Sequence, residues 1–158
     1  MVRTVLARLA GRRSTLAVAE SCTGGALGAA ITAVPGASTG FVGGIIAYAD
    51  GLKSDLLGVD AEILRVRGAV SEEVARAMAR GARRAARADW ALAVTGVAGP
   101  GGGSPGKPVG TVWLAVAGPG CDDAEARLLR ADGGREAVRA AAVDGALRLL
   151  LARLEAAR

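Results

Sequence analysis

Short apolar segments alternate with longer helix-type segments along this chain of 158 residues. Apolar runs of five to nine residues bounded by glycine, proline or polar residues are typical of buried strands, whereas spacing of three and four is typical of helices. The pattern predicts strands at 14–19, 41–48, 90–95, 109–117 and 124–129, and helices at 2–12, 24–33, 53–57, 72–88 and 133–156. Strands that alternate with helices favour an α/β fold.

The order of these segments predicts a three-layer α/β/α sandwich around a mixed, mostly parallel sheet of about five strands. The consecutive late strands imply some antiparallel pairing. The length suits one domain over residues 1–158. Apolar residues make up 51% of the chain but aromatic residues only 3%, so we expect a core of Ala, Val, Leu and Ile with closely approaching backbones.

The charge pattern argues against two classes of partner. The net charge is +5, but the basic residues are dispersed among acidic ones, so a dedicated nucleic-acid surface is not expected. The basic N-terminal segment lacks a continuous apolar run, so neither a secretory signal nor a membrane span is expected, and the chain is assigned to the cytoplasm. Cys22 and Cys121 are far apart and histidine is absent, which disfavours a metal site and predicts free thiols.

The absence of histidine also restricts serine chemistry. Ser21 lies in Ala19-Glu20-Ser21-Cys22-Thr23-Gly24-Gly25, at the expected turn from the first strand to the next helix. Without an imidazole, the remaining general base is a neutral lysine. Ser21 is equally interpretable as a helix N-cap, and the amides of 23–25 are suited to a phosphate or an oxyanion.

Lysine is scarce: the chain has Lys53 and Lys107. Lys53 follows the strand that runs to Tyr48, so it is expected at the sheet edge near the Ser21 turn, although a surface lysine at a helix start is common. Tyr48, the sole tyrosine, either orients the serine or the lysine or simply ends the strand.

The glycine-rich segment 96–108 separates two expected strands and is predicted to be a ligand loop, with a flexible connection as the alternative. Lys107 is followed by Pro108, so the segment does not match a nucleoside triphosphate P-loop. Arg135 and Arg139 at the start of the last helix are candidates for a phosphate, and equally for solvated helix residues.

These segments together resemble the CinA C-terminal domain family, which includes stand-alone nicotinamide-nucleotide amidases. The resemblance runs in order through nearly the whole chain. It is carried by the Ser21 motif, Tyr48 followed by Lys53, Gly68-Ala69-Val70-Ser71, Thr95-Gly96-Val97-Ala98-Gly99-Pro100-Gly101-Gly102, Lys107-Pro108-Val109-Gly110-Thr111-Val112 and Arg135.

The resemblance implies hydrolysis of the carboxamide of nicotinamide mononucleotide to nicotinate mononucleotide and ammonia. It assigns Ser21 as nucleophile, Lys53 as base and Tyr48 as the family tyrosine, with no metal or organic cofactor, and it implies a homodimer. On this mapping the groups expected to hold the pyridine nucleotide are Thr23, Gly24, Gly25, Gly99, Gly101, Gly102 and Arg135.

Two departures accompany the resemblance. The segment Ala49-Asp50-Gly51-Leu52 stands where family members more often carry a Ser/Thr-Asn type of sequence. The N-terminal domain of full-length CinA proteins is not represented, which favours the stand-alone amidase. A non-catalytic nucleotide-binding or regulatory protein connected with competence or DNA damage is the alternative.

Overall fold

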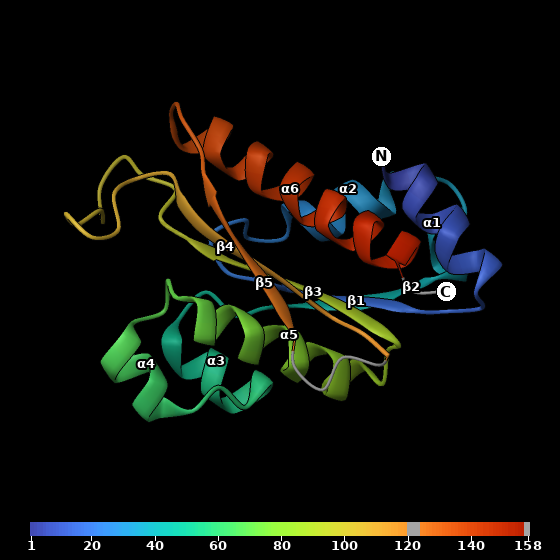
Figure 1. Ribbon diagram of the computed structural model, residues 1–158, viewed down its shortest axis with the longest axis horizontal. Coiled ribbons are helices and arrows are strands. Elements are labelled where there is room, and N and C mark those ends of the chain that lie inside the picture. Colours follow the sequence, from blue (N-terminus) through green and yellow to red (C-terminus); the bar gives the residue numbers. More distant parts are fainter. Residues whose placement is uncertain (120–123, 157–158) are drawn as a thin grey trace.

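A computed structural model describes residues 1–119 and 124–156 of the chain. It contains one five-stranded sheet with helices on both faces (Figure 1). The elements in chain order are α1 Val2–Gly11, β1 Leu16–Glu20, α2 Ala26–Thr32, the 3₁₀ turn η1 Ala37–Thr39, β2 Phe41–Ile46, α3 Asp50–Leu57, α4 Ala61–Arg67, α5 Glu72–Ala86, β3 Trp90–Gly96, β4 Thr111–Ala117, β5 Glu125–Arg130 and α6 Arg135–Ala156.

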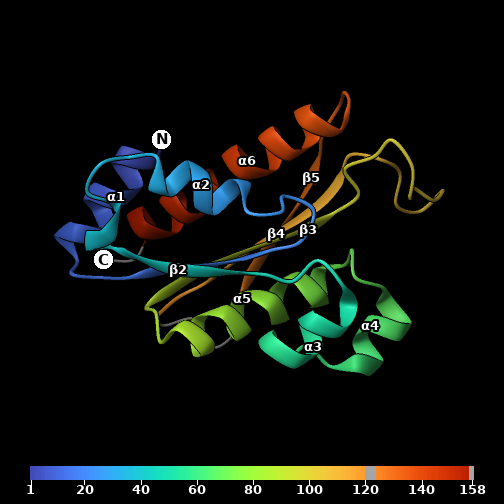
Figure 2. The same ribbon diagram turned by 180° about the vertical axis from the view of Figure 1, so that it is seen from behind.

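The strand order across the sheet is β2-β1-β3-β4-β5. β1 pairs in parallel with β2 and β3, whereas β4 pairs antiparallel with both β3 and β5. β4 therefore runs against the other four strands, and the predicted mixed, mostly parallel sheet is confirmed. Helices α1, α2 and α6 cover one face and α3, α4 and α5 the other (Figures 1 and 2), which confirms the three-layer α/β/α arrangement.

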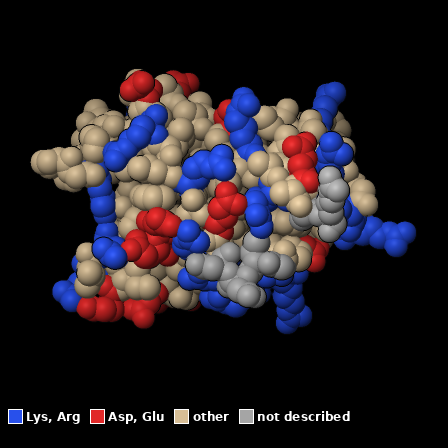
Figure 3. Space-filling model, in the orientation of Figure 1, with Lys and Arg blue, Asp and Glu red and all other residues tan. Residues whose placement is uncertain are grey.

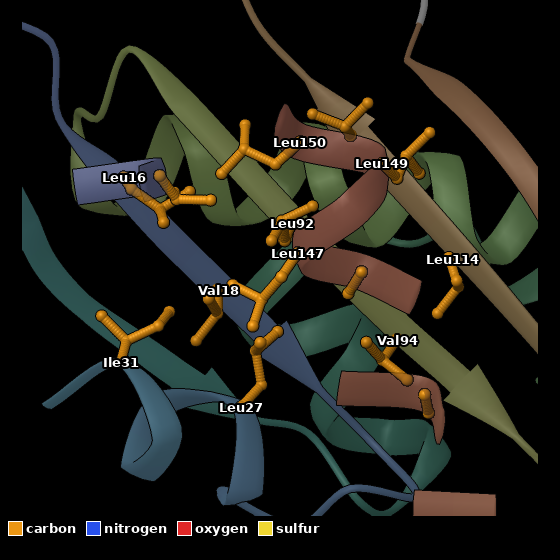
Figure 4. Close-up of a cluster of buried hydrophobic side chains, with 14 of the residues drawn as sticks. Leu16, Val18, Leu27, Ile31, Leu92, Val94, Leu114, Leu147, Leu149 and Leu150 are labelled. Atoms are coloured by element: carbon orange, nitrogen blue, oxygen red, sulfur yellow. The ribbon is translucent and has the colours of Figure 1, made fainter. Parts of the chain in front are cut away.

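Side-chain size differs between the two faces of the central strands. On β1, Leu16 and Val18 point into the cluster beneath α1, α2 and α6, whereas Ala17 and Ala19 face α5. The same alternation recurs on β3, where Leu92 contacts the first cluster (Figure 4). Because successive strand residues point to opposite faces, large aliphatic residues fill one layer and alanines admit α5 closely in the other. This agrees with the expected aliphatic core.

Most predicted elements are present, with two differences around α3 and α4. Helix α3, predicted to begin at residue 53, begins at Asp50, so that Asp50 and Gly51 form its first turn. Helix α4 was not predicted. It is only 7 residues long, and none of its residues is fully buried. Its start is fixed instead by Asp60, whose side chain accepts a hydrogen bond from the Glu62 amide at 2.7 Å.

The predicted start of α5 is confirmed. Ser71 occupies the N-cap, where its hydroxyl accepts from the Val74 amide at 3.4 Å, and two glutamates fill the first turn. Across the described ranges, no helix combines the length and the apolar character that a membrane span requires.

Candidate active site

The carboxyl ends of β1, β2 and β3 lie side by side at one end of the sheet, here called the carboxyl edge (Figure 2). Glu20, the last residue of β1, lies opposite Ile46 of β2 and Val94 of β3. The connection after β1 leads to β2 on one side, and the connection after β3 leads to β4 on the other. In open α/β sheets, ligands bind in the crevice at such a point. The segments that begin at Ser21, Ala47 and Val97 therefore surround the expected position of a ligand.

Ser21 begins the turn between β1 and α2. Its amide donates to the Val94 carbonyl at 2.9 Å, and its carbonyl accepts from the Gly24 amide at 3.0 Å. Ser21 is buried. Helix α2 starts at Ala26, with Gly25 in the cap position, so the N-cap interpretation of Ser21 is wrong. The serine side chain stands at the end of the central strand without a capping role.

Glu20 holds this turn together, a role that the sequence analysis missed. Its buried carboxylate accepts hydrogen bonds from the amides of Gly25 at 3.0 Å, Leu27 at 3.0 Å and Gly28 at 2.8 Å. The N-terminus of α2 is thus occupied by an anion supplied by the chain itself. A glutamate at the end of an apolar run, directly before a glycine-rich turn, is the sequence signal that indicates it.

This arrangement changes which amides face a ligand. Thr23, Gly24 and Gly25 were expected to offer their amides, but the Gly24 amide bonds to Ser21 and the Gly25 amide to Glu20. Of these three, only the Thr23 amide lacks a partner within the described part of the chain. The expectation of free amides at Gly24 and Gly25 is corrected, because a buried carboxylate already satisfies this helix start.

Thr23 and Arg139 form a polar corner beside the turn. The Arg139 Nη2 donates to the Thr23 carbonyl at 2.8 Å. The Thr23 Oγ1 and the Arg139 Nε are buried and make no hydrogen bond within the described residues. Buried polar atoms are normally paired, so these two atoms mark a place where an additional polar group fits.

Arg135 connects three of the predicted segments. Its Nη1 donates to the Gly99 carbonyl at 2.9 Å, and its Nη2 donates to the Tyr48 hydroxyl at 3.1 Å. The start of α6, the glycine-rich loop and the end of β2 therefore meet. Gly101 and Gly102 lie further along the loop and are exposed, and no contact joins them to Arg135 in the part of the chain described.

Lys53 is almost completely buried, with 1% of its side chain exposed. Its Nζ donates to the Tyr48 carbonyl at 3.1 Å and to the Asp50 Oδ1 at 3.0 Å. Among the described hydrogen bonds, none joins Lys53 to Ser21. The Nζ of Lys107 instead donates to the Arg67 carbonyl. Lys53 is thus the buried lysine that follows β2, and the Ser21–Lys53 proton transfer stays a prediction.

Cys22 is buried next to Ser21 as a free thiol, as predicted; Cys121 lies outside the described residues. Desolvation raises the pKa of Cys22 to about 11, although its own backbone amide and the charges of Arg139 and Arg135 act in the opposite direction. Cys22 is therefore protonated at neutral pH. Since the thiolate is the reactive form of cysteine, this thiol is a poor nucleophile. Of these two neighbouring side chains, the hydroxyl of Ser21 is therefore the better candidate nucleophile.

Comparison with known proteins shows the family of this chain. The CinA C-terminal domain profile matches residues 1–154. The chain belongs to the CinA C-terminal domain family. A CinA-like protein of Anaeromyxobacter sp. (strain Fw109-5) is 56% identical over 146 residues, covering 92% of this chain and 35% of the relative. One from Synechococcus sp. (strain RCC307) is 55% identical over 151 residues, covering 95% and 36%.

Solved structures show the same family and fold. The competence/damage inducible protein of Agrobacterium tumefaciens has a TM-score of 0.93 at 41% identity, covering 98% of this chain and 93% of that one. The competence damage-inducible protein A of Klebsiella pneumoniae subsp. pneumoniae MGH 78578 has a TM-score of 0.94 at 39% identity, covering 99% and 96%. The chain spans about a third of the length of the curated CinA-like relatives.

No metal site is built from the described residues: no three His, Cys, Asp or Glu side chains gather there. The segments at this edge instead carry a serine hydroxyl, a buried lysine and two arginines, of which Arg135 bonds to Tyr48 and Arg139 to Thr23. Fixed arginine side chains are suited to hold an anionic group of a ligand.

Proposed function

We propose that this domain hydrolyses the carboxamide of nicotinamide mononucleotide, giving nicotinate mononucleotide and ammonia. The observation that carries the proposal is that separate segments of the chain meet at the carboxyl edge of the sheet. Ser21 follows β1, Tyr48 and Lys53 follow β2, and Arg135 bonds both Tyr48 and the loop at Gly99. These segments are the ones on which the family resemblance rests.

The proposed reaction has two halves. In the first, Lys53 in its amine form takes the Ser21 proton, and Oγ bonds to the amide carbon. The carbon–nitrogen bond then breaks, and ammonia leaves with the proton returned by the lysine. In the second half, water attacks the acyl ester, its proton passes through Lys53 to Ser21, and the carboxylic acid is released.

Binding of the substrate divides between two kinds of group. The free Thr23 amide supports the oxyanion of the tetrahedral intermediate. The phosphate is held by Arg135, whose guanidinium has more donors than its two contacts use. Glu20 occupies the start of α2, so an anionic substrate group is directed away from that helix and toward the arginines.

The test is release of ammonia from nicotinamide mononucleotide by the purified protein. Lys53→Ala and Ser21→Ala are each expected to lower the rate of ammonia release by at least about 10³-fold. Both variants should retain the circular dichroism spectrum of the parent. Lys107→Ala makes the same change at the other lysine and Ser14→Ala at a half-buried serine that precedes β1, so both should remain active. Activity that survives Ser21→Ala would refute the nucleophile.

A second candidate function is nucleotide binding without catalysis. The Lys53 contacts favour it: the ammonium is matched by two acceptors of its own segment and not by Ser21. Calorimetric titration with nicotinamide mononucleotide separates the two. Binding without ammonia release over a range of pH would support the regulatory protein and overturn the amidase.

A further inference from the structure

A groove lies between strands β4 and β5 and the connection from α4 to α5. Its volume is about 310 Å³, which falls within the range of small-molecule pockets. None of the residues that line it belongs to the candidate active site. Two segments that carry the family resemblance contribute to the lining, through Val70 and Ser71 in one and through Lys107 and Thr111 in the other. The proposed hydrolysis uses neither segment.

One wall of the groove is formed by side chains of β4 and β5. Thr111 lies opposite Arg130, and Trp113 lies opposite Leu128. Residues two apart on a strand point to the same face of the sheet, and Trp113 packs against the cluster beneath α5. Trp113 is half-buried and Leu128 is 39% exposed. The wall therefore offers an accessible aromatic ring on the same face as the Arg130 guanidinium.

Both carboxylates that line the groove are already matched by arginines. An oxygen of Glu73 lies 2.9 Å from the Nε of Arg67, and an oxygen of Glu72 lies 2.6 Å from the Nη2 of Arg76. Figure 3 shows the face on which β5 lies in front, where basic and acidic side chains are likewise interspersed. Among the described residues that line the groove, no other acidic side chain is left to balance a further cation.

Two further cations line the groove and contact only neutral oxygens. Arg130 donates to the Thr111 hydroxyl and Lys107 to the Arg67 carbonyl, and within the described ranges neither forms an ion pair. A guanidinium has five donors and an ammonium three, so both cations keep donors that these contacts do not use. The indole nitrogen of Trp113 also has no hydrogen bond to the part of the chain described. The groove therefore combines positive charge, unused donors and an aromatic ring.

We propose that this groove is a second ligand site, which binds the monophosphate of an aromatic nucleoside. The phosphate accepts charge-assisted hydrogen bonds from Arg130 and Lys107. The base stacks on Trp113, a contact that tolerates different bases because each has a flat aromatic face. The site is independent of the proposed hydrolysis, because its residues belong to other segments than Ser21 and Lys53.

The test is the fluorescence of Trp113 during titration with adenosine monophosphate. The chain has two tryptophans, and Trp90 is only 2% exposed, so a ligand that stacks in the groove quenches Trp113. The parent is expected to show saturable quenching. Arg130→Ala should raise the dissociation constant at least about tenfold. Arg127→Ala removes an exposed arginine of the same strand that does not line the groove, so it should bind as the parent does.

Adenosine and inorganic phosphate, titrated separately, should each bind more weakly than adenosine monophosphate, because each occupies only half of the site. Arg135→Ala shows whether the nucleotide binds at the carboxyl edge instead, and it should leave the quenching unchanged because Arg135 does not line the groove. Ammonia release is not part of this readout, so failure of the proposed hydrolysis would leave the test intact.

Three results would overturn the inference: no quenching of the parent, equal quenching of Arg130→Ala and the parent, or quenching that is lost in Arg135→Ala. Circular dichroism of each variant checks that the fold is retained. Arg130→Gln keeps a donor for the Thr111 hydroxyl but has no charge, so it replaces Arg130→Ala as the test if that variant does not fold.

Discussion

Glu20 is a residue whose loss should strongly destabilise this fold. Its two carboxylate oxygens satisfy three amides at the start of α2, and buried amides without partners each cost about 1–3 kcal/mol. Glu20→Ala is therefore expected to lower the free energy of unfolding by about 3 kcal/mol. Glu20→Gln keeps one acceptor oxygen and should lose less. Urea unfolding measures both.

The matched control for Glu20 is Glu155→Ala, which removes an exposed glutamate that lies 3.8 Å from Arg8. It should leave the urea midpoint unchanged, because exposed ion pairs contribute little. An equal loss in Glu20→Ala and Glu155→Ala would contradict the capping role of Glu20.

The buried thiol of Cys22 predicts a pH dependence. Its pKa in the folded state is about 11, against an ordinary value of 9.0, so the folded chain keeps the proton where the unfolded chain loses it. This contribution is complete below pH 9 and is lost as pH rises toward 11. Two pKa units correspond to about 2.7 kcal/mol.

The measurement is the free energy of unfolding of the parent and of Cys22→Ala from about pH 8 to pH 10. The cavity left by the substitution lowers stability by an amount independent of pH. Other groups that titrate in this range are shared by the two proteins, so the difference isolates Cys22. A difference that stays constant with pH would show that the thiol is not shielded from water.

At the residue scale, the sequence indicates which residues are candidates for the site better than it indicates which contacts they make. Ser21, Tyr48 and Arg135 could be selected because their residue types and spacing suit the chemistry. The capping role of Glu20 was not predicted with them: its place before a glycine-rich turn is a signal, but its amide partners are fixed only by the positive φ angles of Gly24 and Gly25. Hydrogen bonds that depend on a turn conformation are not visible in residue spacing.

At the scale of elements, α3 is positioned by a close contact with α5. A Cβ added at Gly81 of α5 would lie 2.0 Å from the Leu57 carbonyl oxygen at the end of α3. Gly81→Ala must therefore separate the helices, with a loss of about 3 kcal/mol. Because α3 carries Lys53, the variant should also lose ammonia release.

Gly51→Ala is the control for Gly81, since it also replaces a helical glycine by alanine. Nothing lies within 4 Å of the Cβ that it would add, so it should stabilise α3 by about 0.5–1 kcal/mol. Thermal unfolding distinguishes the two variants by sign. A stabilising Gly81→Ala would show that α3 and α5 are not in backbone contact.

The elements also show where sequence prediction succeeds. The strands were predicted because their apolar runs are bounded by glycine and polar residues, and α5 because Ser71 caps it. The first turn of α3 was missed because Asp50-Gly51 is typical of a turn, yet here Asp50 starts a helix whose burial against α5 outweighs local preference. The burial of Lys53 follows from that packing, so it was equally invisible.

At the scale of the whole molecule, the homodimer that the family resemblance implies would make thermal stability depend on protein concentration. Association stabilises the folded state by mass action, so the unfolding temperature of the parent should rise as the protein is concentrated. β2 is an edge strand without charged residues, so a dimer formed through it should be lost in Val42→Lys, which would then unfold at a temperature independent of concentration. Val42 is half exposed, so little core packing changes with it.

Leu128→Lys provides the comparison, because it places the same charge on β5, the opposite edge strand, which already carries Glu125, Arg127 and Arg130. Its unfolding temperature should rise with concentration as steeply as that of the parent. If Val42→Lys and the parent shared the same slope, association would occur elsewhere on the molecule. A slope that vanishes only in Val42→Lys would place the association at β2, because that edge alone gains a charge in this variant.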